Sequence, residues 1–166
     1  MEDLTGFVSD DQLAVEPLRE RGWKVDFVPW RAEVDWNHFD AVVIRTPWDY
    51  QDDPAGFLAV LEQITRSRAR LENPLSLVRW NIEKSYLREM EKRGARLAPT
   101  LWEKRFRAEF LHGYFEKLRS PEIIIKPLVS ANADDTYRLS APVPELAVRH
   151  LEKVFAGRRY LVQRFL

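Results

Sequence analysis

The stretch EIIIKPLVSANADDTYRLS, residues 122–140, decides the fold of the second half of the chain. The apolar run 122–127 predicts a buried strand, a polar loop follows, and residues 136–140 predict a return strand. Because side chains alternate along a strand, Lys126 should project to the face opposite Ile125. The stretch therefore predicts a hairpin that carries a partly buried lysine.

A partly buried lysine needs a negative partner, and the sequence offers two. A phosphate would supply one, since two unit charges about 4 Å apart gain roughly 4 kcal/mol at an effective dielectric constant of 20. The small residues of the loop would let backbone amides approach such an anion, although Ala131 and Ala133 are less permissive than glycine. The alternative is a salt bridge from Lys126 to Asp134 or Asp135 across an ordinary hairpin.

A second lysine lies upstream, in VRWNIEKSYL, residues 78–87. We expect a helix from Asn81 to a stop at Gly94. The residues expected on its buried side are Tyr86, Leu87 and Met90. Lys84 then lies in the first turn, where a cation opposes the helix dipole. Either a bound anion offsets that cost, or Lys84 is an exposed lysine with its head in water.

Further elements surround these two lysines. Residues 103–118 predict a helix, residues 144–155 predict an amphipathic helix, and RYLVQRFL, residues 159–166, predicts another strand. The aromatic residues of the first of these helices are Phe106, Phe110, Tyr114 and Phe115. The turn signal Asn73-Pro74 separates this region from the first half, so we expect a boundary between two lobes near residues 73–80.

Two strands are expected in the first half. Residues 24–30, KVDFVPW, alternate and predict a strand in which Val25 and Phe27 share one face. Residues 40–45, DAVVIR, contain a continuous apolar run, which is typical of a strand covered on both faces in a parallel sheet.

Two helices accompany these strands. Residues 10–22 predict a short or kinked helix, because Pro17 interrupts it and Gly22 stops it. Asp53 and Pro54 begin a second helix as its N-cap and its first residue. Its apolar stripe is formed by Phe57, Leu58, Leu61 and Ile64.

A candidate cleft follows the apolar strand, in IRTPWDY, residues 44–50. Ligands of open α/β sheets bind at the carboxyl ends of the strands, so side chains there would line a crevice. These side chains are Arg45, Trp48, Asp49 and Tyr50. The alternative is a turn in which Asp49 pairs with Arg45 and Trp48 packs on the sheet.

Composition excludes several classes of protein. The 166 residues carry 26 Lys and Arg against 26 Asp and Glu, so no net charge draws the chain to nucleic acid or to an anionic membrane. No window approaches the ~18 apolar residues that span a bilayer, cysteine is absent, and the three histidines lack the spacing of metal ligands. Neither a Gly-Lys-Ser/Thr phosphate loop nor the dinucleotide-binding glycine pattern occurs. We expect a soluble cytoplasmic α/β protein.

Six motifs occur in order along the chain: Trp30, IRTPWDY, NPLSLVRWNIEKSYL, PTLW, IIIKPLVSANADDTYRL and LVQRFL. In this order they resemble bacterial ATP-grasp proteins related to glutathione synthetase and to the ligases that join D-alanine units. The resemblance covers nearly the whole chain. It implies that residues 1–75 are a pre-ATP-grasp α/β domain with a parallel sheet. It implies that residues 76–166 are the helical entry and the first, α+β lobe of an incomplete ATP-grasp domain.

The resemblance also implies an ATP site. Lys84 matches the first phosphate-contacting lysine of the family, and Lys126 matches the second, close to the phosphates and the adenine. Residues 130–136 replace the loop that closes over the phosphates, and residues 163–166 match the hinge that holds the adenine edge. The ATP-binding residues implied in this way are Lys84, Lys126, Ser130, Ala131, Asn132, Thr136, Gln163, Phe165 and Leu166.

By the same resemblance, the complete protein is a ligase that makes an acyl phosphate from ATP and a small carboxylate and then lets an amine attack it. Arg45 and Arg79 are candidates for binding the carboxylate in a bidentate way, and Trp48, Asp49 and Tyr50 accompany Arg45 in the cleft. No catalytic residue is assigned.

The family's Mg²⁺ ligands belong to a second lobe beyond Leu166, so we expect this chain alone to be inactive. The alternative is a noncatalytic nucleotide-binding or protein-interaction module that retains half of the fold. If the chain is truncated, residues 160–166 should expose an unpaired apolar edge, which would favour homo-oligomers.

Overall fold

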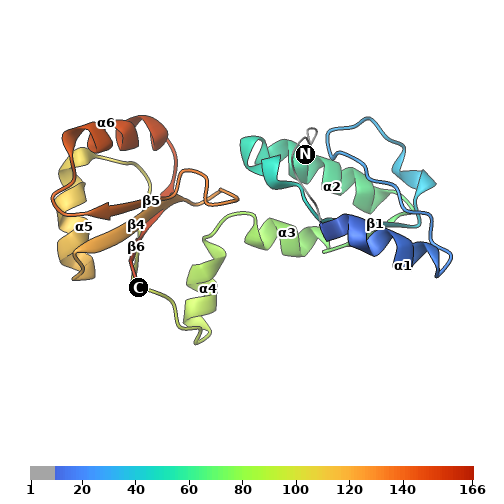
Figure 1. The fold of residues 1–166 in the computed structure, drawn as a ribbon, viewed down its shortest axis with the longest axis horizontal. Coiled ribbons are helices and arrows are strands. Elements are labelled where there is room, and N and C mark those ends of the chain that lie inside the picture. Colours follow the sequence, from blue (N-terminus) through green and yellow to red (C-terminus); the bar gives the residue numbers. More distant parts are fainter. Residues whose placement is uncertain (1–9) are drawn as a thin grey trace. The chain divides into compact units, whose positions relative to one another are not determined.

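A computed structural model describes residues 10–166, and the chain divides into two units at Arg79 and Trp80 (Figure 1). The division falls within one helix, α3 (Leu75–Asn81). Each unit has its own sheet. No helix among residues 10–166 is long and apolar enough to cross a membrane.

The first unit contains a short parallel sheet and one long helix. Its elements are η1 (Asp10–Ala14), α1 (Val15–Arg19), η2 (Trp36–His38), β1 (Ala41–Val43), η3 (Trp48–Asp52), α2 (Pro54–Arg66) and β2 (Arg70–Glu72). Strands β1 and β2 pair in parallel, with Val42 opposite Leu71. As predicted, α2 begins after its N-cap Asp53, whose side chain accepts a hydrogen bond from the Gly56 amide at 2.8 Å.

The core of the first unit lies along the apolar stripe of α2. Phe57, Leu61 and Ile64 are buried, and Trp30 packs edge-on against Phe57 with ring centroids 5.4 Å apart. The short first helix is also confirmed, since η1 and α1 end before Gly22, which has a φ of 83°.

One strand prediction for the first unit is wrong, and another is wrong in part. Residues 24–30 form no strand, because no described strand pairs with them, and Phe27 is 58% exposed. Strand β1 lies where predicted but is not covered on both faces, since Val43 is 54% exposed. Alternation shows which residues could share a face, but it does not supply the neighbouring strand or the covering layer.

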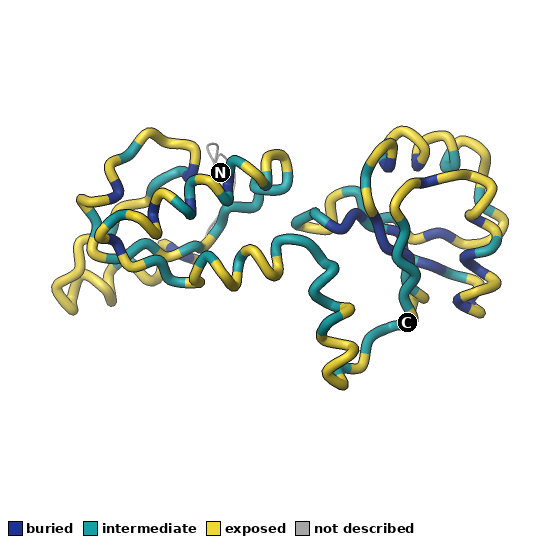
Figure 2. Tube along the Cα trace, turned by 180° about the vertical axis from the view of Figure 1, so that it is seen from behind, coloured by how far each residue is buried: buried dark blue, intermediate teal, exposed yellow. Residues whose placement is uncertain are grey.

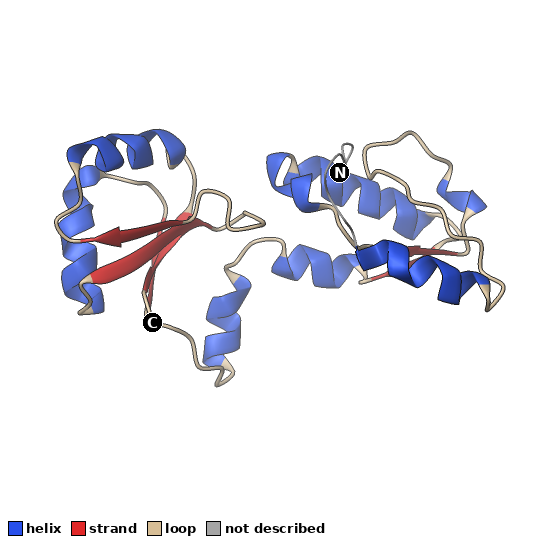
Figure 3. Ribbon diagram, viewed as in Figure 1, coloured by secondary structure: helices blue, strands red, loops and turns tan. Residues whose placement is uncertain are grey.

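The second unit is a four-stranded antiparallel sheet with helices (Figure 3). Its strands, in the order β3-β6-β4-β5, are β3 (Thr100–Glu103), β6 (Tyr160–Arg164), β4 (Glu122–Pro127) and β5 (Tyr137–Ser140). Its other elements are α4 (Tyr86–Lys92), η4 (Ala108–Phe110), α5 (Leu111–Leu118) and α6 (Glu145–Val154). The predicted hairpin, amphipathic helix and last strand are confirmed.

One face of this sheet packs against α5 and α6, and the buried residues follow it along the strands (Figure 2). Ile123, Ile125 and Val162 are fully buried there. The hydroxyls of Tyr114 and Tyr160 are 2.7 Å apart and form a hydrogen bond within this core. Every residue of this core belongs to the second unit.

Two helices of the second unit begin later than predicted. A single helix from Asn81 does not form, because Asn81 ends α3 and the Lys84 amide donates to the carbonyl of Leu128 instead of to a helical carbonyl. Glu103 lies in β3, where it pairs with Tyr160, so the next helix waits until Leu111.

Two further expectations for the second unit differ from the structure. Met90 is 37% exposed, although it was expected on the buried side of its helix. The expected unpaired edge at residues 160–166 is wrong, because β6 lies between β3 and β4 and pairs with both.

Candidate functional site

The face of the second sheet that points away from α5 and α6 carries the predicted lysine. Alternation and strand register place nine side chains on this face, which we call the lysine face. They are Thr100, Trp102, Glu122, Ile124, Lys126, Arg138, Ser140, Leu161 and Gln163. The prediction that Lys126 lies opposite Ile125 is confirmed, since Ile125 is fully buried and Lys126 is half-buried.

Lys84 lies in the turn between α3 and α4 and is tied to the end of β4. Its amide donates to the carbonyl of Leu128 at 2.8 Å. Its Nζ donates to the carbonyl of Ser130 at 2.9 Å and to the Ser130 Oγ at 2.7 Å. Burial, and then the charge of nearby Lys126, lower the pKa of Lys84 to about 8. Lys84 is thus neither in a first helical turn nor extended into water.

Lys126 is half-buried, and burial lowers the pKa of its ammonium. Among residues 10–166 its ammonium has no hydrogen-bond or ion-pair partner. The alternative of a salt bridge to the hairpin loop is wrong, because Lys126 forms an ion pair with neither Asp134 nor Asp135, and Asp135 pairs with Arg158. Two lysines therefore lie close together, partly removed from water and with no carboxylate between them. Such a pair is suited to binding an anion.

The loop after β4 adopts a conformation that is uncommon for its residues. Asn132, Ala133 and Asp135 have positive φ values of 49°, 60° and 53°. The loop is closed by amides, since Asp134 donates to the Ala131 carbonyl at 2.8 Å. Of the predicted loop residues, Ser130 contacts Lys84, Asn132 is exposed, and Thr136 donates through its amide to Ala133.

The predicted hinge lies at the opposite end of β4 from Lys126. Gln163 donates to the Thr100 hydroxyl at 3.0 Å, and the Phe165 amide donates to the Glu122 carbonyl at 3.2 Å. Leu166 is 85% exposed.

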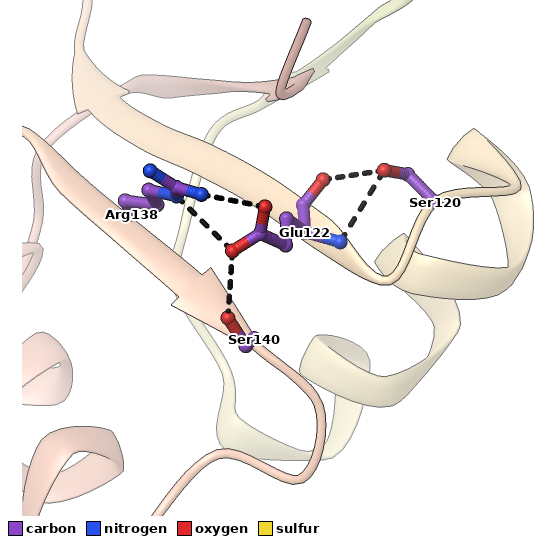
Figure 4. Close-up of polar contacts among 4 residues, drawn as sticks. All are labelled: Ser120, Glu122, Arg138 and Ser140. Atoms are coloured by element: carbon purple, nitrogen blue, oxygen red, sulfur yellow. Dashed lines mark hydrogen bonds and ion pairs between the residues drawn. The ribbon is translucent and has the colours of Figure 1, made fainter.

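An ionic cluster that sequence reasoning missed supports this hinge. The Glu122 carboxylate accepts hydrogen bonds from Arg138 Nε at 3.1 Å, Arg138 Nη2 at 2.7 Å and the Ser140 hydroxyl at 3.0 Å (Figure 4). These bonds lower the pKa of Glu122. The same guanidinium lies 3.8 Å from the ring centroid of Phe165. The alternation of residues 137–140 could have indicated that Arg138 lies opposite the buried Leu139.

The predicted substrate residues lie in the first unit, where the arginines have partners. Arg45 Nε donates to the buried Asp11 at 2.6 Å. The alternative pairing of Arg45 with Asp49 is wrong, since Asp49 pairs with Arg31 and accepts from the Trp30 indole at 3.0 Å.

The other substrate candidates have structural contacts as well. Tyr50 packs against Phe57 with ring centroids 5.8 Å apart, and Trp48 is half-buried in η3. Arg79 forms an ion pair with Glu62. In the part of the chain that the structure describes, no group of three His, Cys, Asp or Glu side chains could hold a metal ion. The residues that the structure describes therefore do not fit a Mg²⁺ site.

Comparison with known proteins gives a family match within the first unit and a curated relative that matches both units. Residues 1–73 match the family described as the N-terminal domain of the D-cycloserine synthetase DcsG. The chain is 30% identical over 158 residues to the cycloserine biosynthesis protein DcsG of Streptomyces lavendulae, covering 89% of this chain and 50% of that protein. The chain thus spans about half the length of the curated relative it matches.

Solved structures agree in fold. The crystal structure of D-cycloserine synthetase DcsG has a TM-score of 0.81 and 28% identity, with 95% of this chain and 54% of that chain covered. The ATP-grasp ligase PsnB, solved with a minimal precursor, Mg and ADP, has a TM-score of 0.55 and 19% identity, with 93% and 61% covered. The resemblance to ATP-grasp proteins predicted from the motifs is confirmed, and the chain is similar to the amino-terminal part of these ligases.

Proposed function

We propose that this chain is the ATP-binding amino-terminal part of an ATP-grasp carboxylate-amine ligase. The observation that carries the proposal is the pair formed by Lys84 and Lys126, half-buried and without a carboxylate partner in the described part of the chain. Holding two such cations together is unfavourable unless an anion joins them. The triphosphate of ATP is the anion that the fold relatives suggest.

The surroundings of the two lysines suit a nucleotide. Ile124 and Trp102 are partly exposed on the lysine face and provide apolar surface for a base, and Gln163 and Phe165 belong to the proposed hinge. Ser130 already orients the Lys84 ammonium. We assign residues 80–166 the role of first ATP-grasp lobe and the unit before them the role of substrate-side domain, in the cytoplasm, where ATP is available.

In the complete protein, ATP would phosphorylate a small carboxylate, and an amine would displace phosphate from the resulting acyl phosphate. We propose Arg45 and Arg79 for binding the carboxylate, because a guanidinium matches it in a bidentate way. Each would exchange or share its present partner, Asp11 or Glu62, with the substrate. A noncatalytic module would bind ATP equally well and would differ only in showing no turnover at full length.

Calorimetry tests the nucleotide site. We expect ATP to bind more tightly than AMP, since only the triphosphate supplies all the anions that the lysines can meet. Lys126→Met should weaken ATP binding by about 1.5 to 3 kcal/mol, the range for hydrogen bonds to charged groups. Lys153→Met, which removes an exposed lysine from the last turn of α6, is the matched control. Unchanged ATP affinity in Lys126→Met would exclude Lys126 from the site.

A further inference from the structure

The turn between α6 and β6 binds two segments that lie beside Lys84 and Lys126, namely the loop after β4 and the turn before α4. Gly157 has a φ of 72°, which allows the chain to reverse there. The next two side chains bind different segments. Arg158 forms an ion pair with Asp135 of the loop. Arg159 Nη1 lies 3.0 Å from Glu83 Oε1 and 3.1 Å from Oε2, so it binds the residue directly before Lys84.

The backbone of this turn is also linked to Lys84. The amide of Leu128 donates to the carbonyl of Arg159 at 3.0 Å, and the amide of Lys84 donates to the carbonyl of Leu128 at 2.8 Å. Arg159 therefore restrains the Lys84 turn twice, through its side chain to Glu83 and through its carbonyl to Leu128.

These links matter because the site holds like charges together. Lys84 and Lys126 repel each other, and Lys84 lies in the turn before α4, where its carbonyl accepts one hydrogen bond from the Leu87 amide at 3.0 Å. Its position therefore depends on contacts outside the helix as well. A guanidinium stays charged at every accessible pH and holds a carboxylate in a fixed planar geometry. The two arginines can therefore keep the turn and the loop in place before an anion arrives.

We propose that Arg158 and Arg159 are positioning residues of the phosphate site. Arg159 fixes the turn that carries Lys84, and Arg158 fixes the loop that begins with Ser130, the partner of Lys84. Neither arginine contacts the nucleotide; both reduce the reorganisation that binding requires. The inference rests on the proposed ATP function and adds to it residues that act through their neighbours.

A double-mutant cycle on the chain tests the Arg159 link. Arg159→Met should lower ATP affinity by on the order of tenfold. In metal sites, losing a residue that orients a metal ligand lowers metal affinity by a similar factor. Glu83→Gln combined with Arg159→Met should bind no more weakly than Arg159→Met alone, because the two residues form one link. Arg149→Met removes an arginine paired with Glu145 on α6 and should bind ATP as the wild type does.

The Arg158 link is tested in the same way with Arg158→Met and Asp135→Asn. We expect each variant to lose ATP affinity, and the pair to lose no more than Arg158→Met alone. Both arginines are partly exposed, and ion pairs of this kind contribute little to stability, so the melting temperature should not change.

Hydrogen exchange separates positioning from general stability. In Arg159→Met the amide of Lys84 should exchange faster, while the amides of β6 keep their wild-type protection. A lower melting temperature with loss of protection throughout β6 would assign the arginine to the fold and overturn the inference. So would wild-type ATP affinity in both arginine variants. If the wild type binds no ATP, the proposed function fails. Independently of that result, an unchanged exchange rate of the Lys84 amide in Arg159→Met would overturn the positioning role.

Discussion

The protonation of Lys84 should control nucleotide binding. Its pKa of about 8 lies below the ordinary lysine value of about 10.4, so between these values the unfolded chain keeps a proton that the folded chain has lost. Stability should therefore rise with pH over this window. ATP binds the protonated form, so its affinity should fall as pH rises above 8, and binding near pH 8 should take up protons.

Calorimetry in buffers of different ionisation enthalpy measures this proton uptake directly. Lys84→Met is the control, because it removes the titrating group and should abolish the uptake. Equal uptake in the wild type and in Lys84→Met would show that another group titrates on binding.

Ala133 holds a left-handed conformation with a φ of 60°. A residue with a Cβ is disfavoured there by about 1 to 2 kcal/mol, whereas glycine costs some entropy of the unfolded chain. Ala133→Gly should therefore stabilise the chain by about 1 kcal/mol in urea unfolding. Ala131→Gly, in the same loop but without a positive φ, should destabilise it.

Glu122 joins β4, β5 and the segment after β6. Hydrogen bonds from Arg138 lower its pKa from the ordinary 4.5, so its contribution to stability is present above that value and is lost as the pH falls through the lowered pKa. Glu122→Gln should destabilise the chain at pH 7, and the difference from the wild type should vanish in strong acid. Urea unfolding at both pH values measures it, with Glu145→Gln as a control for charge loss. A difference that persists in acid would contradict this assignment.

Elements whose signals are local could be predicted from the sequence. The helix α2 follows from the N-cap Asp53 and its apolar stripe, and the β4-β5 hairpin follows from its apolar run and polar loop. Elements that depend on distant partners could not. The turn at Lys84 is set by a bond to Leu128, 44 residues later, which competes with the helix that the local sequence favours.

The candidate site, like the fold, could be predicted from the sequence only in part. Family motifs indicated Lys84, Lys126 and Ser130, and the structure brings Lys84 and Ser130 into contact. The partners of the arginines were beyond sequence reasoning, because a charged residue can pair with any of many opposite charges. Arg45 binds Asp11, which is distant in sequence, rather than the nearby Asp49.

The second unit contains its own core and all the proposed ATP-binding residues. We predict that residues 80–166, expressed alone, unfold cooperatively and bind ATP as tightly as the whole chain does. Thermal denaturation and calorimetry check both statements. Folded but non-binding residues 80–166 would show that the first unit contributes to the nucleotide site.

The position of β6 in the middle of its sheet sets an order of events during synthesis. Strand β3 leaves the ribosome some sixty residues before its partner, since Thr100 pairs with Gln163. The β4-β5 hairpin can close early, but β3 remains without a neighbour until Tyr160–Arg164 has been translated and inserts between β3 and β4. Closing so long a loop is slow relative to hairpin formation, so the sheet becomes continuous only after these residues have left the ribosome.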